Sequence, residues 1–319
     1  ETTAWNFQQG AMLQWHPLYP NEKIIFNIRE KESYHGVIYD IQSGAKTILD
    51  LPVANVDPTG RYALSVNFNR MFDFRAGYGY EGVTDKYKDI ATPKEDGIFL
   101  IDLATGKAKR ILSLYDIAEI TKSTLPFEGA KLIVNHITFN TDGSRFVFLP
   151  RNFPAEGIRW KTAIVTANTD GSDPYVLSGY DMASHYHWKD KNHLVIYAGG
   201  KMGHQLYVLK DQSDEYEVLD KDYFVQDGHC SYSPDQRWLL YDSYPDREHY
   251  RHLYLYSLDQ MKGITLGSYY APPEITGDFR CDLHPRWNHK GDRISFDSIH
   301  EGQRHIYYID MDECKKLFY

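Results

Sequence analysis

Four histidines of this chain recur at the same position relative to a following aromatic residue. Each stands three positions before a Phe, Trp or Tyr, and the four are His136, His185, His229 and His284. Neutral imidazole binds transition-metal ions, and its proton affinity lies near neutral pH, so it also serves as a general acid or base. The repeat therefore indicates a metal site or a proton-transfer site, provided that the fold brings the histidines together. His187, two residues after His185, is a secondary candidate for the same site.

The segments around these histidines repeat a four-part pattern of short apolar strands. Each unit ends in two apolar strands joined by a polar turn, as in GVIYDIQSGAKTIL (36–49) and IFLIDLATGKAKRIL (98–112). Before this pair stands another strand, such as RFVFLP or WLLYDS, and before that a further short one, such as NHITFN or GHCSYS. Six such units cover nearly the whole chain, and the last ends in IYYIDMDECKKLF (306–318). Four strands in about 45 to 55 residues is the period of a β-propeller blade.

The predicted fold is therefore all-β: a single β-propeller domain over residues 1–319, built of four-stranded antiparallel blades. We count six blades, with seven as the alternative. The composition agrees, because Tyr, Phe and Trp make up 15% of the chain and suit the half-buried surface of a pleated sheet. Residues 67–95 interrupt the second unit and form a predicted loop insertion, whose GYGYEG segment suits packing on a ligand.

Blade topology predicts where the repeated histidines lie. The innermost strand of a blade begins at the face where the loop between its second and third strands emerges. Because the four histidines stand at the start of the innermost strands of four consecutive units, we expect them at one end of the central channel. A structural role is the alternative, since propeller repeats often carry a histidine that bonds within its own blade.

Cationic side chains gather in the loops predicted at that same face. They include Arg29, Arg70, Arg75, Arg151, Arg159, Lys201, Arg247, Arg251 and Arg304, with Arg280 on the approach to the last inner strand. The chain as a whole is acidic, with 35 Lys and Arg against 44 Asp and Glu and a net charge of −9. A cationic mouth on an acidic protein predicts an anionic ligand without general binding of nucleic acid. Arginine suits a carboxylate ligand, because its planar fork bonds both oxygens.

Other features of the sequence exclude several function classes. No phosphate-binding loop, dinucleotide fingerprint or nucleophile elbow is present. The three cysteines, without a Cys-x-x-Cys pair, argue against a zinc ribbon and a disulfide framework. No apolar run approaches the roughly 20 residues that a membrane helix needs, which predicts a soluble chain. The compartment stays open between cytoplasm and periplasm.

At these residues the sequence resembles the TolB-like β-propellers and, within that group, the oligogalacturonate lyases of polysaccharide lyase family 22. Members of this family bind a divalent metal, typically Mn²⁺, through histidines and a glutamine. The resemblance implies that His229 in GHCSYSPD and His284 in DLHPRWNHKGD are metal ligands. Asp282 stands where the family has a further histidine, and a carboxylate also binds hard cations. Alternatively, Arg280 replaces the metal charge in a metal-free site.

The same resemblance implies catalytic roles for residues of the preceding units. His185 in SHYHW matches the catalytic histidine of the family, and Arg159 lies at a suitable spacing for its catalytic arginine. His136 or Tyr186 is a candidate donor of the proton to the leaving group. The family has seven blades where we count six, so the resemblance is partial.

Together these features lead to two hypotheses. The first is a polysaccharide-lyase-like enzyme that cleaves acidic, uronate-containing oligosaccharides by β-elimination. Its expected substrate-binding residues are Arg280, Arg151, Tyr186, His187 and Arg251. The second is a non-catalytic β-propeller that binds an acidic glycan or a protein partner. Under both hypotheses we expect no nucleic acid and no membrane as partners, and a monomer or simple homo-oligomer.

Overall fold

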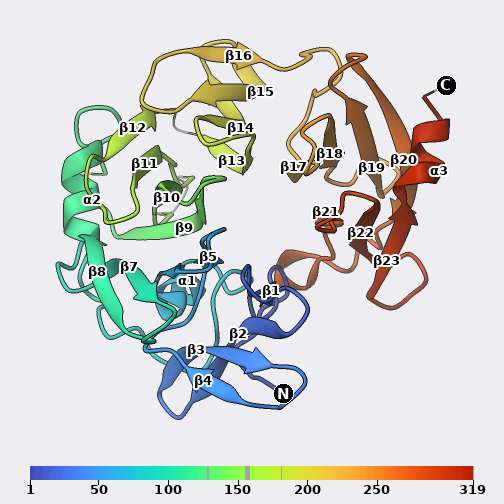
Figure 1. Cartoon of the computed structure of the whole chain (residues 1–319). Coiled ribbons are helices and arrows are strands. Elements are labelled where there is room, and N and C mark those ends of the chain that lie inside the picture. Colours follow the sequence, from blue (N-terminus) through green and yellow to red (C-terminus); the bar gives the residue numbers. More distant parts are fainter. Residues whose placement is uncertain (128, 155–158, 181, 319) are drawn as a thin grey trace. The chain divides into compact units, whose positions relative to one another are not determined.

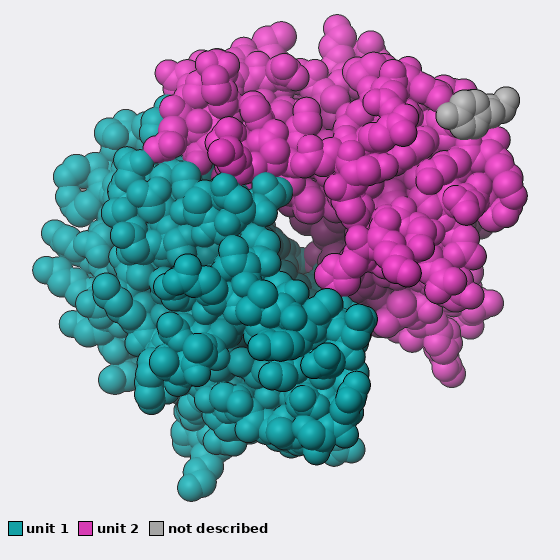
Figure 2. Space-filling view, in the orientation of Figure 1, with its two compact units in different colours: residues 1–181 teal, residues 182–319 magenta. Residues whose placement is uncertain are grey.

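The chain folds into six antiparallel sheets that are the blades of a β-propeller. The structure is a computed structural model, and it describes residues 1–127, 129–154, 159–180 and 182–318. These residues form two compact units, residues 1–181 and residues 182–319 (Figure 2). Three sheets fall in each unit, and within every sheet consecutive strands are neighbours (Figure 1). The predicted all-β fold and the count of six blades are confirmed.

Unit 1 holds the first three blades. Blade one is formed by β1 (Gln14–Trp15), β2 (Lys23–Glu30), β3 (Ser33–Asp40) and β4 (Lys46–Ile48). Blade two is formed by β5 (Asn55–Val56), β6 (Tyr62–Ser65), β7 (Gly97–Asp102) and β8 (Ala108–Ser113). Blade three is formed by β9 (Leu132–Phe139), β10 (Arg145–Asn152), β11 (Ile164–Asn168) and β12 (Tyr175–Ser178).

The outer hairpins of these blades close as their turn residues demand. After β3, the Asp40 carboxylate accepts hydrogen bonds from the backbone N–H groups of Gln42 and Ser43, at 3.1 and 2.8 Å. Gly44 then adopts φ +74°, a left-handed conformation that costs glycine little. The turn after β7 repeats this arrangement with Asp102 and with Gly106 at φ +73°. This repeat is the physical basis of the pattern seen in the sequence.

Residues 67–95 lie between β6 and β7 and contain the helix α1 (Phe68–Phe74), capped by the Asn67 side chain. The segment is organised around Arg70, which is only 1% exposed. Its guanidinium pairs with Asp85 at 3.1 Å and donates to backbone carbonyls, including that of Leu132 at 2.6 Å. The insertion is therefore held in unit 1 by buried polar contacts. A second helix, α2 (Leu114–Thr121), follows β8 and begins with a capping box at Ser113.

Unit 2 holds the last three blades. Blade four is formed by β13 (Ala183–Trp188), β14 (His193–Gly200), β15 (Gly203–Lys210) and β16 (Tyr216–Val218). Blade five is formed by β17 (Cys230–Tyr232), β18 (Trp238–Asp242), β19 (Tyr250–Ser257) and β20 (Lys262–Tyr270). After the short 3-10 helix η1 (Gly277–Phe279), blade six is formed by β21 (Arg286–Trp287), β22 (Arg293–Ser298) and β23 (His305–Asp310).

Blade six differs from the predicted four-strand pattern. Among the described residues it has three strands, and the segment expected to form a fourth strand is the helix α3 (Met311–Lys316). Asp312 and Glu313 lie in its first turn and Lys315 and Lys316 in its last, which suits the helix dipole at both ends. The helix also buries Met311 and Cys314 against blades five and six. These terms favour a helix over a strand.

Among the described residues, the core of unit 2 includes two aromatic-rich clusters. One surrounds Tyr241 and Tyr256, and the other joins Trp238, Phe296 and Met311. Complete burial of such a side chain stabilises the fold by about 1.5 to 3 kcal/mol. The cysteines Cys230, Cys281 and Cys314 are buried and form no disulfide. No helix in the described part of the chain is long and apolar enough to cross a membrane.

Candidate functional site

The repeated histidines sit at irregular points of the inner strands. In blade three, His136 has φ +52° and is the extra residue of a β-bulge, because Asn135 and Ile137 pair with the consecutive residues Leu149 and Phe148. In blade four, a register shift between Ala183 and Tyr186 places His185 in a bulge. In blade six, His284 has φ +42°, just before β21. Bulges re-aim side chains and are frequent near active sites.

His185 is held by a carboxylate from the segment that leads into blade five. Its Nδ1 lies 3.0 Å from Oδ1 of Asp227 and 3.2 Å from Oγ of Ser184. Burial raises the pKa of Asp227, but its interactions with His185 and His229 together with hydrogen bonds outweigh burial and leave this pKa below its usual value. An ionised Asp227 accepts the Nδ1 proton, so the lone pair of the ring is on Nε2.

His229 is held by a carboxylate from its own blade. Asp242 at the end of β18 lies 2.9 Å from its Nδ1 and also accepts its backbone N–H at 2.6 Å. The backbone N–H of Asp242 in turn donates to the carbonyl of His229 at 3.1 Å. The strand pairing of blade five therefore sets the position of Asp242 opposite His229, and this carboxylate is 1% exposed.

His284 has the equivalent aspartate in blade six at a longer distance. Oδ2 of Asp297 lies 4.0 Å from its Nδ1, and the Asp297 backbone N–H donates to the carbonyl of Leu283 at 2.8 Å. The other oxygen of Asp297 accepts a bond from Arg286 at 2.9 Å. Nδ1 of His284 is buried and has no hydrogen-bond partner among the described residues.

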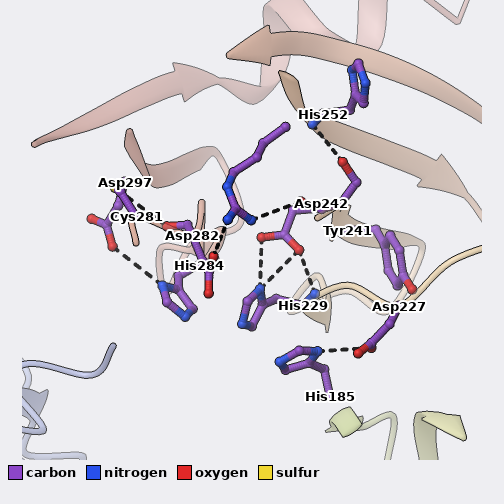
Figure 3. Close-up of polar contacts among 12 residues, drawn as sticks. His185, Asp227, His229, Tyr241, Asp242, His252, Cys281, Asp282, His284 and Asp297 are labelled. Atoms are coloured by element: carbon purple, nitrogen blue, oxygen red, sulfur yellow. Dashed lines mark hydrogen bonds and ion pairs between the residues drawn. The ribbon is translucent and has the colours of Figure 1, made fainter. Parts of the chain in front are cut away.

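The three rings lie against one another in unit 2 (Figure 3). The ring centroids of His185 and His229 are 3.9 Å apart, and those of His229 and His284 are 4.2 Å apart. They come from three consecutive blades, so the aligned register of the sequence brings them together in space. Adjacent imidazolium rings would repel each other, so burial and nearby carboxylates decide which ring is charged.

The surroundings shift the pKa values of two of these rings in opposite directions. Burial lowers the pKa of His229, but the carboxylates of Asp242, Asp282 and Asp227 outweigh it, and the net pKa lies above its usual value. Burial, and then the neighbouring side chains of His229, His185, Arg286 and Arg304, hold the pKa of His284 well below its usual value. The pKa values of these two adjacent rings are thus separated, and His229 keeps its proton to a higher pH than His284.

Asp282 connects this stack to two arginines. It is fully buried, and Oδ1 lies 2.7 Å from Nη2 of Arg251. Nε of Arg280 donates to Oδ2 at 2.8 Å and to Oδ1 at 3.1 Å. Burial raises the pKa of Asp282, but Arg251, Arg280 and His229 outweigh it and keep the pKa below its usual value.

The residues predicted to hold a metal form a compact donor set. One ligand atom from each of His229, Asp282 and His284 lies within 4.8 Å of the others. Asp242 on Nδ1 of His229 is the carboxylate–histidine arrangement that orients metal-binding imidazoles. The unpartnered Nδ1 of His284 is a further donor, and Asp282 keeps lone-pair capacity beyond its arginine contacts. Two imidazoles and a carboxylate suit a divalent transition metal.

His187 and Tyr186 lie on β13 beside His185, but the contacts of His187 point to a structural role. Its Nδ1 accepts the backbone N–H of Tyr232 at 3.4 Å. Burial lowers the pKa of His187 to about 4, so the ring is neutral near pH 7.

Three further predicted residues belong to unit 1. His136 packs edge-on against Tyr78, with ring centroids 5.7 Å apart. Arg151 is buried on β10, where it forms a bridge with Thr162. Arg159 lies in an exposed segment outside the strands. Of the four repeated histidines, the structure brings the three of unit 2 together.

The carboxylates that hold the three rings, Asp227, Asp242 and Asp297, were not predicted from the sequence. Of the carboxylates at the site, the sequence indicated Asp282 alone. A signal for two of the missed residues was present, because Asp242 and Asp297 each end a second strand with the same Asp-Ser pair. Asp227, in an irregular segment, had no such signal. Of the predicted cationic residues, Arg251 and Arg280 are bound to Asp282, and the nearby Arg286 is bound to Asp297.

The sequence matches no family profile and no curated protein. The fold matches an oligogalacturonate lyase from Vibrio parahaemolyticus, with 13% identity, a TM-score of 0.62 and coverage of 93% of this chain and 76% of that one. It also matches an oligogalacturonate lyase in complex with manganese, with 11% identity, a TM-score of 0.56 and coverage of 97% and 89%. TolB from Acinetobacter baumannii matches with 12% identity, a TM-score of 0.52 and coverage of 91% and 61%.

These similarities concern the fold. The fold of this chain resembles those of TolB and, in part, of the oligogalacturonate lyases, as its sequence indicated. At 11 to 13% identity, activity has to be argued from the site itself.

Proposed function

We propose that this chain is a polysaccharide-lyase-like enzyme that cleaves acidic, uronate-containing oligosaccharides by β-elimination. The observation that carries the proposal is the stack of His185, His229 and His284, which three successive blades supply. Two of the three rings bond an aspartate through Nδ1, and the third has one 4.0 Å away. The likeness in fold to two oligogalacturonate lyases is consistent with it.

The proposed reaction makes three demands on the site. The C5 proton of a uronate residue must be removed, and its electron pair forms the C4–C5 double bond. The C4–O4 bond breaks as this double bond forms, and the departing oxygen keeps the electron pair of the C4–O4 bond and takes up a proton. The carboxylate on C5 must be neutralised, because it accepts negative charge as the proton leaves. No oxidant, reductant or water molecule is consumed.

In this proposal His185 is the base. Asp227 on Nδ1 holds the tautomer whose lone pair is on Nε2, so Nε2 takes the C5 proton. The ionised Asp227 also stabilises the imidazolium that results. Tyr186 and His136 remain the candidate donors of the proton to O4.

Positive charge for the substrate carboxylate is the second part of the proposal. Three carboxylates raise the pKa of His229 above its usual value and so favour its charged form. A divalent metal ion, Mn²⁺ by resemblance, would be held by His229, His284 and Asp282 and would supply positive charge in place of the His229 proton. Arg280 is the alternative source of charge in a metal-free site.

Substrate contacts complete the proposal. Arg159, which the resemblance implies as the catalytic arginine, and Arg151 are the proposed contacts from unit 1. In unit 2, Arg251 and Arg280 act through Asp282, which they hold in place.

The test is direct assay of elimination. The purified protein is incubated with oligouronides of several linkages, with and without Mn²⁺, and ultraviolet absorbance of the conjugated product is followed. We expect turnover on at least one uronide, and its loss in His185→Ala. A silent wild-type protein on the whole panel, with metal supplied, would overturn the proposal.

A non-catalytic propeller that binds acidic glycans is the competing outcome. It predicts uronide binding without an unsaturated product, and binding that persists in His185→Ala. Isothermal titration of both proteins with the same uronides separates the two functions.

A further inference from the structure

Four arginines surround His284 in unit 2, and three of them are already bound to carboxylates. Arg251 and Arg280 pair with Asp282 at 2.7 and 2.8 Å. Arg286 pairs with Asp297 at 2.9 Å. The fourth is Arg304, and among the described residues it has neither a hydrogen bond nor an ion pair to a carboxylate.

The unpaired state of Arg304 is physically costly. Its Nη1 is buried from solvent and lacks a hydrogen-bond partner among the described residues. A buried donor without a partner loses about 1 to 3 kcal/mol, and more when it is charged. Such a group in a native protein calls for an explanation, and a catalytic role or a bound ion or water molecule is among the possible ones.

Strand pairing places Arg304 beside the histidine stack. The backbone N–H of Asp297 bonds to the carbonyl of Leu283, which brings β22 next to His284. Ser298, the next residue, pairs with His305, and Arg304 immediately precedes His305. Arg304 and His284 are thus about two strand spacings apart, or roughly 10 Å between backbones, which two inward side chains can bridge.

We propose that Arg304 is the carboxylate-binding residue that selects uronate over neutral sugar at this site. The identity of the anion as a uronate rests on the proposed function, whereas the need of Arg304 for an anion rests on its own unpaired donor. A carboxylate accepts two parallel N–H bonds from a guanidinium, and each of the other three arginines is already paired with an aspartate. Arg304 thus acts on substrate preference, while His185 acts on the C5 proton.

The first experiment compares substrates with and without the carboxylate. Arg304→Gln, Arg304→Lys and the control Arg293→Gln are assayed on digalacturonate and on its methyl ester. Arg293 lies on the same blade, but it is largely exposed and pairs with Asp310 at the surface. We expect Arg304→Gln to lower kcat/KM for the acid about ten- to a hundredfold.

The kcat/KM for the methyl ester is expected to change little in Arg304→Gln. The variant should therefore no longer prefer the acid over the ester. Arg304→Lys should recover part of this preference, and Arg293→Gln should match the wild type. An unchanged preference in Arg304→Gln would overturn the inference while leaving the lyase proposal intact.

A binding experiment keeps the inference testable if the wild type cleaves no uronide. Galacturonate is titrated while the melting temperatures of the wild type and of Arg304→Gln are measured. Stabilisation of the wild type alone supports the anion site even when the lyase proposal has failed. Equal stabilisation of both proteins, or of neither, overturns it.

The ligand-free variants provide a fold control. Because Arg304→Gln removes an unpaired buried charge, its melting temperature without ligand should equal or exceed that of the wild type. A lowered melting temperature would mean that Arg304 stabilises the fold itself and would contradict the proposed role.

Discussion

His229 and His284 occupy the same register position in neighbouring blades, yet their surroundings drive their pKa values in opposite directions. Asp242 touches Nδ1 of His229 directly, whereas Asp297 stands 4.0 Å from His284 and is shared with Arg286. The close carboxylate raises the pKa of His229, whereas burial and the nearby cations lower that of His284. Pairs of like groups with separated pKa values are typical of acid–base sites.

Replacing Asp242 by Asn tests this origin of the His229 charge. We expect the pKa of His229 to fall in Asp242→Asn, because burial is then opposed only by the more distant carboxylates. The measurement is an NMR titration of histidine-labelled protein. Since the folded-state pKa is raised, the stabilising charge pair exists below the unfolded pKa and is lost as pH rises through the folded one. The stability gap between the two proteins should accordingly narrow with rising pH, and a gap independent of pH would contradict this origin.

Asp282 gives a second prediction, on stability. Asp282→Asn leaves Arg251 and Arg280 without their carboxylate, and Arg251 is only 4% exposed. Breaking a buried pair in this way costs about 3 to 5 kcal/mol, measured by urea unfolding near pH 7. The folded pKa of Asp282 is lowered, so its contribution exists above the unfolded pKa and is lost as pH falls through the folded value.

The matched control is Asp259→Asn, which breaks an exposed ion pair with Arg237. We expect it to cost at most about 1 kcal/mol. If Asp259→Asn and Asp282→Asn cost the same, burial is not the source of the effect.

Single residues also show how far the sequence leads toward the site. Spacing from an aromatic residue found His185, His229 and His284, because strand register repeats from blade to blade. The carboxylate partners were missed, since hydrogen bonds across strands leave little trace in local spacing. Arg251 and Arg280 were found as arginines, but their binding to Asp282 depends on a buried contact that no linear pattern encodes.

At the scale of elements, the inner strands are irregular where the histidines lie. A bulge adds one residue to one strand, and it places His136 at φ +52° and His185 between paired positions. Hydrophobic alternation predicts a strand but not which of its residues is extra. The sequence thus predicted the blades and their order, while the directions of the histidine side chains are known only from the structure.

The bulge in blade three can be tested by comparing two substitutions at His136. Asn tolerates the left-handed conformation, whereas β-branched Val does not. We expect His136→Val to destabilise the protein by about 1 to 3 kcal/mol more than His136→Asn. Urea unfolding measures the difference. Equal stabilities would show that the backbone relaxes without cost at this position.

Helix α3 shows a different limit of pattern-based prediction. The segment after β23 lacks the turn glycine of the first three outer hairpins, and charges of suitable sign lie at its two ends. Repetition favoured a fourth strand, but helix formation and burial of Met311 and Cys314 prevailed. Local chemistry decides where a repeat ends.

At the scale of the whole molecule, a bound metal ion should appear as added stability. If His229, Asp282 and His284 hold the ion, Mn²⁺ at a hundred times its dissociation constant stabilises the folded chain by about 2.7 kcal/mol. We expect a rise in melting temperature with Mn²⁺ that EDTA reverses and that His229→Ala with His284→Ala abolishes. An identical rise in the double variant would place the ion elsewhere.

The pH dependence of that stabilisation has a definite sign. Metal binding must displace the proton of His229, whose pKa is raised. Affinity for Mn²⁺ should therefore decrease as pH falls, with uptake of the ion releasing a proton. Calorimetry in two buffers of different ionisation enthalpy counts that proton. Affinity that does not vary with pH would contradict His229 as a ligand.

The three buried cysteines of unit 2 are natural probes of local unfolding. Cys230 lies in β17, Cys281 before β21 and Cys314 in α3, and burial raises the pKa of each thiol, that of Cys314 to about 11. A thiol-reactive dye reaches such a group only when its covering structure opens. The rate of labelling at each cysteine, resolved by peptide mass spectrometry, thus measures how often three adjoining segments separate, without any engineered probe.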